Sequence, residues 1–288
     1  MSKIEIVWLL GSNGFTAKYL VPILQAKGYI VETEEVDITD TDKVEKAILR
    51  IQPSYIINLA GISFVPDEGS AEIYAINTFG PQNILNACLK LDSPPNKIIL
   101  ASSSHIYGEQ QVETIDESCL ANPINHYGCS KWAMEQIAKT YNEKLNILIT
   151  RPFNYTGIGQ ADYFLIPKIV SHFQKKEKII SLGNVDIWRD FSDVRWIAEV
   201  YSELLTIKSE EKIFNLCSNT LTSLRDILAV MQQESGYEIE IQLNPQFIRE
   251  ADLKKQKGSN KLLLHELSRI NQPRNIKETL RWMLHSAT

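Results

Sequence analysis

The 288-residue sequence has few cysteines and no long hydrophobic run. No two of its four cysteines lie at C-x-x-C spacing, so they predict neither a zinc site nor a disulfide framework. Reduced thiols are typical of cytoplasmic proteins. No apolar stretch approaches the roughly 20 residues that a membrane helix needs. The short apolar run near the N-terminus ends in a glycine turn, unlike a signal peptide. We therefore expect a cytoplasmic protein without a metal site or a membrane partner.

Positive charge is also scarce. The chain carries 30 Lys and Arg against 35 Asp and Glu, a net charge of −5, with no block of like charges. This balance argues against nucleic acid as a partner. The hydrophobic share of 44% and charged share of 23% are ordinary for a globular protein. With no internal repeat or low-complexity linker, the length predicts one large domain or two smaller ones.

A glycine turn follows the first apolar run. Residues 4–10 have the length of a buried strand, and residues 11–17 (GSNGFTA) follow it directly before a helical pattern. The turn resembles the dinucleotide fingerprint G-x-x-G-x-x-G, with Ala17 in the last position. Gly11 permits a tight turn, and Gly14 lets backbone N–H groups approach a pyrophosphate at the helix N-terminus. The alternative is a plain strand-to-helix turn. We expect a nucleotide cofactor to contact Gly11, Asn13, Gly14 and Phe15.

The second strand, at residues 28–33, bears on the choice of cofactor. An acidic residue at its end often binds the ribose hydroxyls of NAD, whereas a nearby Arg accommodates the 2′-phosphate of NADP. Here the chain continues Glu-Glu-Val-Asp-Ile, and no Arg or Lys occurs until Lys43. This pattern favours NAD slightly over NADP, with contacts at Asp37 and Ile38. A solvated acidic edge is the alternative.

The third strand, at residues 55–61, ends in small residues over which a cofactor could pass: Leu59, Ala60 and Gly61. A long helical pattern covers residues 71–90 and contains one polar residue on a largely apolar face, Asn77. Asn77 is either a hydrogen-bonded core residue or a part of the site.

Serines follow the next strand, at residues 97–101. Parallel α/β sheets bind ligands at the carboxyl ends of their strands, where Ser102, Ser103 and Ser104 would lie. One of them could hydrogen-bond a substrate oxygen, although serines that cap a loop are the alternative.

Tyr127 and Lys131 are spaced one helical turn apart, so they share a face of the helix that begins near residue 126. A free phenol has a pKa near about 10, and a neighbouring ammonium lowers it, which would make a proton donor and acceptor useful near neutral pH. The spacing alone is also common on solvated helix faces.

The alternation of strands and helices up to a strand at 145–150 predicts an α/β fold, a Rossmann-type doubly wound parallel sheet. We expect a smaller C-terminal substrate-binding domain beside it. The expected NAD(P)-binding domain comprises residues 1–152 and 186–217, and the expected nucleotide-sugar-binding domain comprises residues 153–185 and 218–288.

Six motifs together, in their order along the chain, indicate a family: GSNGFTA, NLAG (58–61), Asn77, SSSHIYG (102–108), YGCSK (127–131) and RPFN (151–154). Over nearly its whole length the sequence resembles the extended short-chain dehydrogenase/reductase family, in its nucleotide-sugar epimerase, dehydratase and reductase branch. The resemblance implies NAD or NADP as cofactor and a catalytic set of Ser103, Tyr127 and Lys131. Ser103 would hold the substrate oxygen and Tyr127 would transfer the proton. Lys131 would hold the nicotinamide ribose and lower the pKa of Tyr127, and Asn77 would support the site.

Two stretches narrow the resemblance. Residues 151–160 and 182–195 are similar to GDP-4-keto-6-deoxymannose reductases, whose close relatives are the GDP-mannose 4,6-dehydratases. Tyr155 stands where many of the reductases have His. Arg suits phosphate because its planar fork binds two oxygens. The alternative for Arg189 is a surface ion pair with a neighbouring Asp (190 or 193). The resemblance implies substrate contacts at Ser104, His105, Asn154, Arg189 and Arg249.

His105 bears on the reaction. Dehydratases of this branch have Glu at this place, because they must also remove a C5 proton and expel the C6 hydroxyl, although related reductases often have Glu here too. The alternatives for His105 are a base or a residue that only packs or binds the sugar. We therefore expect NAD(P)H-dependent reduction of the C4 keto group of a 4-keto-6-deoxy nucleotide sugar, for example GDP-4-keto-6-deoxymannose to GDP-rhamnose. A nucleotide-sugar 4,6-dehydratase or epimerase and a non-catalytic NAD(P)-sensing protein are the alternatives. The resemblance also implies a homodimer through helices 71–90 and 126–144.

Overall fold

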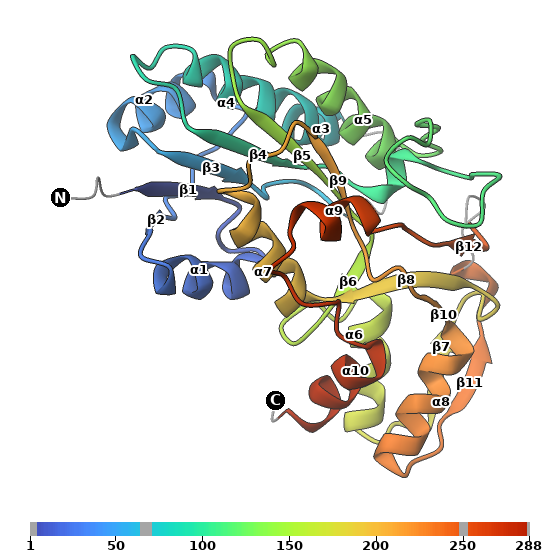
Figure 1. Ribbon diagram of the computed structural model, residues 1–288. Coiled ribbons are helices and arrows are strands. Elements are labelled where there is room, and N and C mark those ends of the chain that lie inside the picture. The colour runs from blue at the N-terminus through green and yellow to red at the C-terminus, as the bar shows by residue number, and fades with distance from the viewer. Residues whose placement is uncertain (1–4, 64–70, 248–252, 287–288) are drawn as a thin grey trace.

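The computed structural model describes residues 5–63, 71–247 and 253–286. Its largest unit is a six-stranded sheet in the order β2–β1–β3–β4–β5–β9, in which every neighbouring pair is parallel (Figure 1). The predicted Rossmann-type α/β fold is confirmed. The strands are β1 (Ile6–Leu10), β2 (Ile30–Glu32), β3 (Tyr55–Asn58), β4 (Lys97–Ala101), β5 (Ile147–Pro152) and β9 (Ile213–Leu216).

Helices cover both faces of this sheet, which is why β1 is apolar at every position. Val7 and Leu9 face the core beneath α1 (Ala17–Ala26) and α7 (Val194–Leu204). Trp8 and Leu10 face the opposite core. That core is covered by α2 (Thr41–Ile51), α4 (Gly80–Cys88) and α5 (His126–Lys139), as Figure 1 shows.

Two helices differ from their expected bounds. The expected helix 71–90 consists of α3 (Ala71–Tyr74), a π-helical turn η1 (Ala75–Phe79) and α4. Pro81 has no N–H to donate to the carbonyl of Asn77, and the Gly80 N–H instead reaches back to the Ala75 carbonyl. The expected helix 126–144 ends at Lys139, where the Thr140 hydroxyl bonds the Ile137 carbonyl at 2.8 Å.

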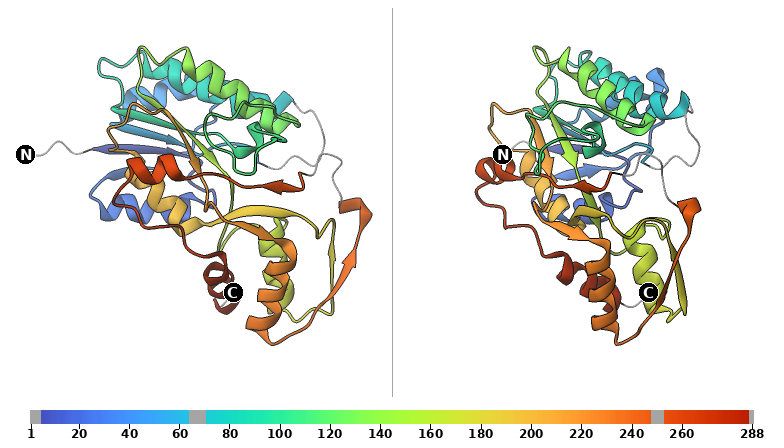
Figure 2. Two further views of the ribbon diagram at one scale, coloured as in Figure 1. Left: turned by 45° about the vertical axis from the view of Figure 1, so that its right-hand side comes forward. Right: turned by 90° about the vertical axis from the view of Figure 1, so that its right-hand side faces the viewer.

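The rest of the chain forms a second layered unit (Figure 2). Its strand β8 (Trp188–Asp193) pairs with β6 (Asn154–Thr156), β10 (Leu221–Ser223) and β12 (Lys255–Gln256), and β7 (Ile179–Leu182) pairs with β11 (Glu240–Leu243). Strands β7 and β8 share a core with α6 (Leu165–Gln174), α8 (Leu224–Ser235) and α10 (Ile276–His285). Helix α9 (Lys261–Glu266) instead packs on the first sheet through Leu263. The proposed division into two domains stays a prediction.

The fold gathers the expected site segments at one edge of the sheet. The chain reverses direction across the sheet at β1, with β2 on one side and β3 on the other, and such switch points open a crevice at the carboxyl ends of the strands. The Leu59 N–H bonds the Leu10 carbonyl at 3.0 Å, and the Ser102 N–H bonds the Thr150 carbonyl at 2.7 Å. The ends of β1, β3, β4 and β5 are therefore in register. Among the described helices, none is long and apolar enough to cross a membrane.

Candidate active site

The glycine turn lies tightly against the end of β3. Gly11 has φ +75°, and a Cβ there would lie 2.7 Å from the Ala60 nitrogen, so only glycine fits. The Gly14 N–H closes the turn on the Gly11 carbonyl at 3.0 Å. The Asn13 amide donates to the carboxylate of Glu35, which anchors the turn to the segment after β2. The turn leads directly into the N-terminus of α1, where unpaired N–H groups favour a diphosphate.

An open pocket of about 400 Å³ follows β2. Asp37 is exposed there, and its carboxylate accepts hydrogen bonds from the N–H and hydroxyl of Thr39, which lower its pKa. Ile38 is buried beneath Gly80, where a Cβ would lie 2.5 Å from the Ile38 Cδ1.

Basic side chains from α2 enter this same pocket. Lys43, Lys46 and Arg50 line it together with residues 34–37, and Arg50 forms an ion pair with Glu34. The sequence argument for NAD rested on the lack of nearby basic residues. The fold supplies them from the next helix, so the preference for NAD stays a prediction with a weaker basis.

Ser103 and Tyr127 meet at the end of β4. Ser103 precedes the turn η2 (Ser104–Ile106), and its Oγ accepts the His105 N–H at 3.2 Å. Asn125 caps α5 by accepting the Gly128 N–H at 2.8 Å, which places Tyr127 in the first turn of the helix. The Ser103 side chain lies near enough to the Tyr127 phenol to lower its pKa. The structure therefore brings two of the three expected catalytic side chains close together.

Gly128 makes this approach possible, and sequence reasoning missed it. A Cβ at Gly128 would lie 2.6 Å from the His105 carbonyl oxygen and 3.0 Å from Pro123. The first turn of α5 can pack against η2 only because this position has no side chain. A glycine between Tyr127 and Lys131 was the signal that could have revealed it.

Lys131 lies between the ends of β3 and β4. Its Nζ donates to the Ala101 carbonyl at 2.8 Å, and a Cβ at Gly61 would lie 3.1 Å from that nitrogen. Burial lowers the pKa of Lys131 to about 8, and the nearby Glu135 partly opposes this effect. Gly61 therefore leaves the room that the ammonium occupies.

The phenol of Tyr127 does not have the expected low pKa. Burial raises the pKa of Tyr127 to about 12, the Ser103 hydrogen bond lowers it in part, and the Tyr155 phenol raises it. The expectation that Lys131 lowers this pKa stays a prediction. In this structure the Lys131 ammonium donates to the Ala101 carbonyl.

Asn77 lies fully buried in the π-helical turn, and such turns often mark functional sites. Its Nδ2 donates to the Ile62 carbonyl at 3.0 Å and the Ser130 Oγ at 3.2 Å, and its Oδ1 accepts the Ile62 N–H at 2.9 Å. Both amide hydrogens are therefore engaged. Asn77 ties the segment after β3 to α5, one residue before Lys131.

A buried ion pair holds α5 against β5, and sequence reasoning missed it as well. Arg151 binds the carboxylate of Glu135 through two bonds of 3.0 and 2.6 Å. Its Nη1 donates to the Tyr107 hydroxyl at 2.9 Å, which donates in turn to Asn215 at 2.7 Å. This network links α5, β5, β9 and the chain after Ser103.

His105 lies beside Tyr127, with the two rings edge to face at 5.3 Å, and its side chain is exposed. Ser104 is buried, and its carbonyl accepts the Gln256 amide of β12 at 3.2 Å. Of the expected substrate contacts, His105 therefore lies beside Tyr127, and Ser104 is its neighbour in η2.

The other expected substrate residues lie in the second unit. Asn154 is in β6, opposite Phe191 of β8, the strand that carries Arg189. Arg189 donates to the carbonyls of Trp188 and Lys254 at 2.9 and 3.4 Å. The two aspartates that the sequence offered to Arg189 bind elsewhere: Asp190 accepts from Ser218 and Gly258, and Asp193 from Arg195. Arg249 lies outside the described residues. Within the described residues, no cluster of His, Cys, Asp and Glu could hold a metal ion.

Known proteins are similar to this chain over its whole length. The family described as GDP-mannose 4,6 dehydratase matches residues 12–285. The GDP-6-deoxy-D-talose 4-dehydrogenase of Aggregatibacter actinomycetemcomitans is 33% identical over 91% of this chain and 90% of its own. The GDP-6-deoxy-D-mannose reductase of Pseudomonas aeruginosa is 27% identical over 96% of this chain and 95% of its own.

Solved structures agree. A Burkholderia cenocepacia protein whose proposed activity is that of an epimerase has a TM-score of 0.91 and 34% identity over 97% of both chains. RMD from Pseudomonas aeruginosa, complexed with NADPH, has a TM-score of 0.85 and 26% identity, covering 98% of this chain and 96% of its own. These structures and the family match over residues 12–285 agree on the family of the chain. The protein belongs to the GDP-mannose 4,6-dehydratase family of extended short-chain dehydrogenase/reductases.

Proposed function

We propose that the protein reduces the C4 keto group of a GDP-linked 4-keto-6-deoxyhexose with NADH or NADPH. The observation that carries this proposal is its full-length similarity to two enzymes that are both named for redox chemistry on GDP-6-deoxyhexoses. Ser103 and Tyr127, which lie close enough for Ser103 to lower the pKa of the phenol, would supply the matching chemistry.

The glycine turn and the strand ends fit a dinucleotide. Gly11 lets the turn pack against the end of β3, and the N-terminus of α1 faces the turn as a site for the diphosphate. Bound NAD(P)H would supply a hydride to C4. The residues that would hold it are Gly11, Asn13, Gly14, Phe15, Asp37, Ile38, Leu59, Ala60, Gly61, Asn77, Tyr127 and Lys131.

The catalytic roles follow from the ionisation states. Reduction of a ketone needs a proton donor for the oxygen at C4. Because burial keeps the pKa of Tyr127 near 12, its phenol carries that proton at neutral pH. Ser103 would hold the same oxygen by a hydrogen bond. Lys131 would bind the nicotinamide ribose through its ammonium.

The nucleotide sugar would lie between the two units. Asn154 on β6 and Arg189 on β8 occupy neighbouring strands, so they can contact one ligand. We propose that Asn154 binds a sugar or diphosphate oxygen and that Arg189 and Arg249 bind the nucleotide diphosphate. Ser104 and His105 would contact the sugar.

The two relatives imply different products. 6-Deoxytalose and 6-deoxymannose differ only in the configuration at C4, so the face of the keto group that meets the cofactor decides between them. A dehydratase or epimerase is the second candidate, since the family takes its description from a 4,6-dehydratase. His105 favours the reductase, because the dehydratase reaction needs an additional acid/base group that relatives supply as Glu at this place.

The test is to incubate the protein with GDP-4-keto-6-deoxymannose and either NADH or NADPH and to follow cofactor absorbance. We expect oxidation of the cofactor, and the coupling constants of the product's C4 proton in NMR spectra would distinguish talose from mannose. Tyr127→Phe should lower the rate by about 10²–10⁴-fold and leave cofactor binding intact. Turnover of GDP-mannose without net cofactor oxidation would refute the reductase and support the dehydratase.

We further propose that the protein works in the cytoplasm as a homodimer. The helices α3 to α5 lie next to one another at the outer surface (Figure 1), and Phe79 in η1 is 53% exposed there. The homodimer would pair these helices with their copies in a second chain.

A further inference from the structure

One tyrosine joins the cofactor turn to the substrate strand. Tyr155 lies in β6 directly after Asn154. Its hydroxyl hydrogen-bonds the Thr16 Oγ1 at 2.8 Å, and its ring stacks on Phe15 with a centroid distance of 6.0 Å and an angle of 9°. Thr16 and Phe15 belong to the glycine turn, 139 residues earlier in the chain. Side chains alternate along a strand, so Tyr155 and Asn154 leave β6 on opposite sides.

Thr16 is diverted from the usual role of its position. It precedes α1, where a threonine hydroxyl normally caps a helix N–H, yet its side chain makes no capping bond. The hydroxyl binds Tyr155 instead. The N–H groups at the start of α1 therefore remain available to an anion. The Thr16 side chain instead connects the turn to Tyr155.

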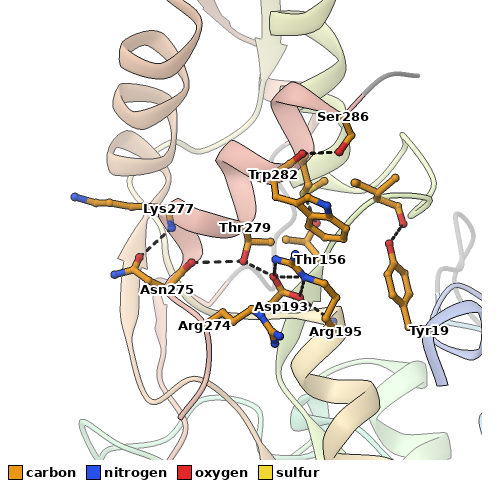
Figure 3. Close-up of polar contacts among 12 residues, drawn as sticks. Tyr19, Thr156, Asp193, Arg195, Arg274, Asn275, Lys277, Thr279, Trp282 and Ser286 are labelled. Carbon is orange, nitrogen blue, oxygen red and sulfur yellow. Dashed lines mark hydrogen bonds and ion pairs between the residues drawn. The ribbon is translucent and has the colours of Figure 1, made fainter. Parts of the chain in front are cut away.

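The chain after Tyr155 is held from two further sides. The Tyr19 hydroxyl of α1 donates to the Ile158 carbonyl at 2.6 Å (Figure 3). A Cβ at Gly157 would lie 2.4 Å from Val194 and 3.2 Å from Trp282 of α10.

The ring of Trp282 is itself fixed. The Arg195 guanidinium lies 3.7 Å from the ring and binds Asp193, which also accepts the Thr279 hydroxyl at 2.8 Å. These residues lie together where β8 and α7 meet α10, as Figure 3 shows. The chain after Tyr155 therefore has fixed neighbours in α1, α7 and α10.

We propose that Tyr155 is a positioning residue that couples cofactor binding in the turn 11–16 to the placement of Asn154 on β6. A cofactor diphosphate orders the turn, the hydroxyl of Thr16 holds the phenol of Tyr155, and the neighbouring Asn154 is set for the nucleotide sugar. This role rests on the proposed function, in which Asn154 contacts that substrate.

Hydrogen–deuterium exchange tests the coupling without any sugar. NADH or NADPH, whichever binds more tightly, is added to the full chain, and exchange is followed by mass spectrometry. In the wild type we expect the cofactor to slow exchange in peptides covering residues 11–16 and 152–160, the latter by about fivefold or more. Tyr155→Phe should keep the slowing at 11–16 and lose it at 152–160.

Variants of the partner and a remote control complete the design. Thr16→Val should reproduce the loss at 152–160, Thr16→Ser should restore the protection, and Tyr155→Phe should add nothing to Thr16→Val. Tyr237→Phe removes a phenol hydroxyl that donates to the Lys176 and Glu177 carbonyls at 3.0 and 3.3 Å, far from the turn, and should behave as the wild type.

Two outcomes would overturn the coupling: full protection of 152–160 in Tyr155→Phe, or no cofactor effect on this segment in the wild type. A wrong substrate would show itself differently, as normal exchange behaviour in a protein that leaves GDP-4-keto-6-deoxymannose unreduced.

Discussion

At the residue scale, the ionisation of Lys131 has a measurable consequence for cofactor binding. Burial lowers its pKa to about 8, so the ammonium is present below that pH and is lost above it. Tyr127 stays protonated throughout the range, since its pKa is raised to about 12. If the Lys131 ammonium binds the ribose, cofactor affinity must fall as the pH rises through about 8.

Titration of the enzyme with NADPH at pH 6.5 to 9.5, followed by cofactor fluorescence, measures this dependence. We expect the dissociation constant to rise by up to about tenfold across the range. Lys131→Met should bind weakly with little pH dependence between these limits. An equally steep pH profile in Lys131→Met would assign the titration to another group.

Gly128 offers a second prediction at this scale. An alanine normally stabilises a helix interior relative to glycine by up to about 1 kcal/mol. At Gly128 the new Cβ would lie 2.6 Å from the His105 carbonyl oxygen, and this backbone atom cannot rotate away. We expect Gly128→Ala to shift the first turn of α5 and lower kcat by about 10²-fold, because small misplacements of catalytic groups are costly.

The neighbouring Cys129→Ala is the matched control and should retain the wild-type kcat. Circular dichroism of both variants separates a displaced active site from a failure to fold. Normal kcat in a folded Gly128→Ala variant would show that the approach of α5 to η2 has no role in catalysis.

At the element scale, α2 determines the charge of the pocket behind β2. Arg50 is the natural partner for a 2′-phosphate, but Glu34 already pairs with it. We expect Arg50→Gln to raise the KM for NADPH by about tenfold and to change the KM for NADH by less than about threefold. Glu34→Gln should lower the KM for NADPH, because it frees the guanidinium of Arg50.

Lys90→Gln is a fitting control, since it breaks another exposed ion pair of α2, with Glu45, outside the pocket. Steady-state kinetics with NADH and with NADPH measure these KM values. Equal changes for NADH and NADPH in Arg50→Gln would remove Arg50 from cofactor discrimination.

At the scale of the whole molecule, a buried carboxylate makes stability depend on pH. Asp190 is fully buried between the units' connecting segments, and burial raises its pKa to about 6 despite hydrogen bonds from Ser218 and Gly258. An unfolded Asp titrates near about 3.9. The folded state therefore binds the proton more tightly, and this contribution to stability is present below about pH 4 and lost as the pH rises through 6.

Urea unfolding at pH 4 to 7 measures this contribution by comparison with Asp190→Asn. We expect the free energy of unfolding of the wild type, relative to the variant, to fall by up to about 3 kcal/mol over the range. Asp186→Asn is the control, because Arg225 lowers the pKa of the exposed Asp186 and the group stays ionised across this range, so its profile should run parallel to that of the wild type. Parallel profiles for the wild type and Asp190→Asn would contradict the assignment.

The proposed dimer is a second prediction for the whole molecule. Phe79→Asp places a charge on the exposed surface formed by η1 and α5. We expect the mass measured by light scattering to fall from that of two 32.8 kDa chains to that of one chain. Leu49→Asp, at a 43% exposed apolar site on α2, should leave the mass unchanged. A monomeric wild type would end this proposal.

Patterns within short stretches of the sequence were sufficient to predict the architecture. A buried strand, a glycine turn and an amphipathic helix are signals within about 20 residues, so the parallel sheet and the turn at Gly11 were predictable. The spacing of Tyr127 and Lys131 is equally local, since one helical turn defines it. The family followed from six such signals in order.

The tertiary structure decided what depends on contacts between distant segments. The pKa of Tyr127 follows from burial and from Ser103, which lies 24 positions away, so the spacing to Lys131 could not predict it. Arg50 reaches Glu34, and Tyr155 reaches Thr16, only because packing brings their elements together. Sequence by itself determined the fold and the family, whereas the structure alone decided the ionisation of Tyr127 and Lys131 and the link between turn and strand. The reason is that ionisation and coupling depend on neighbours in space, which adjacent residues do not encode.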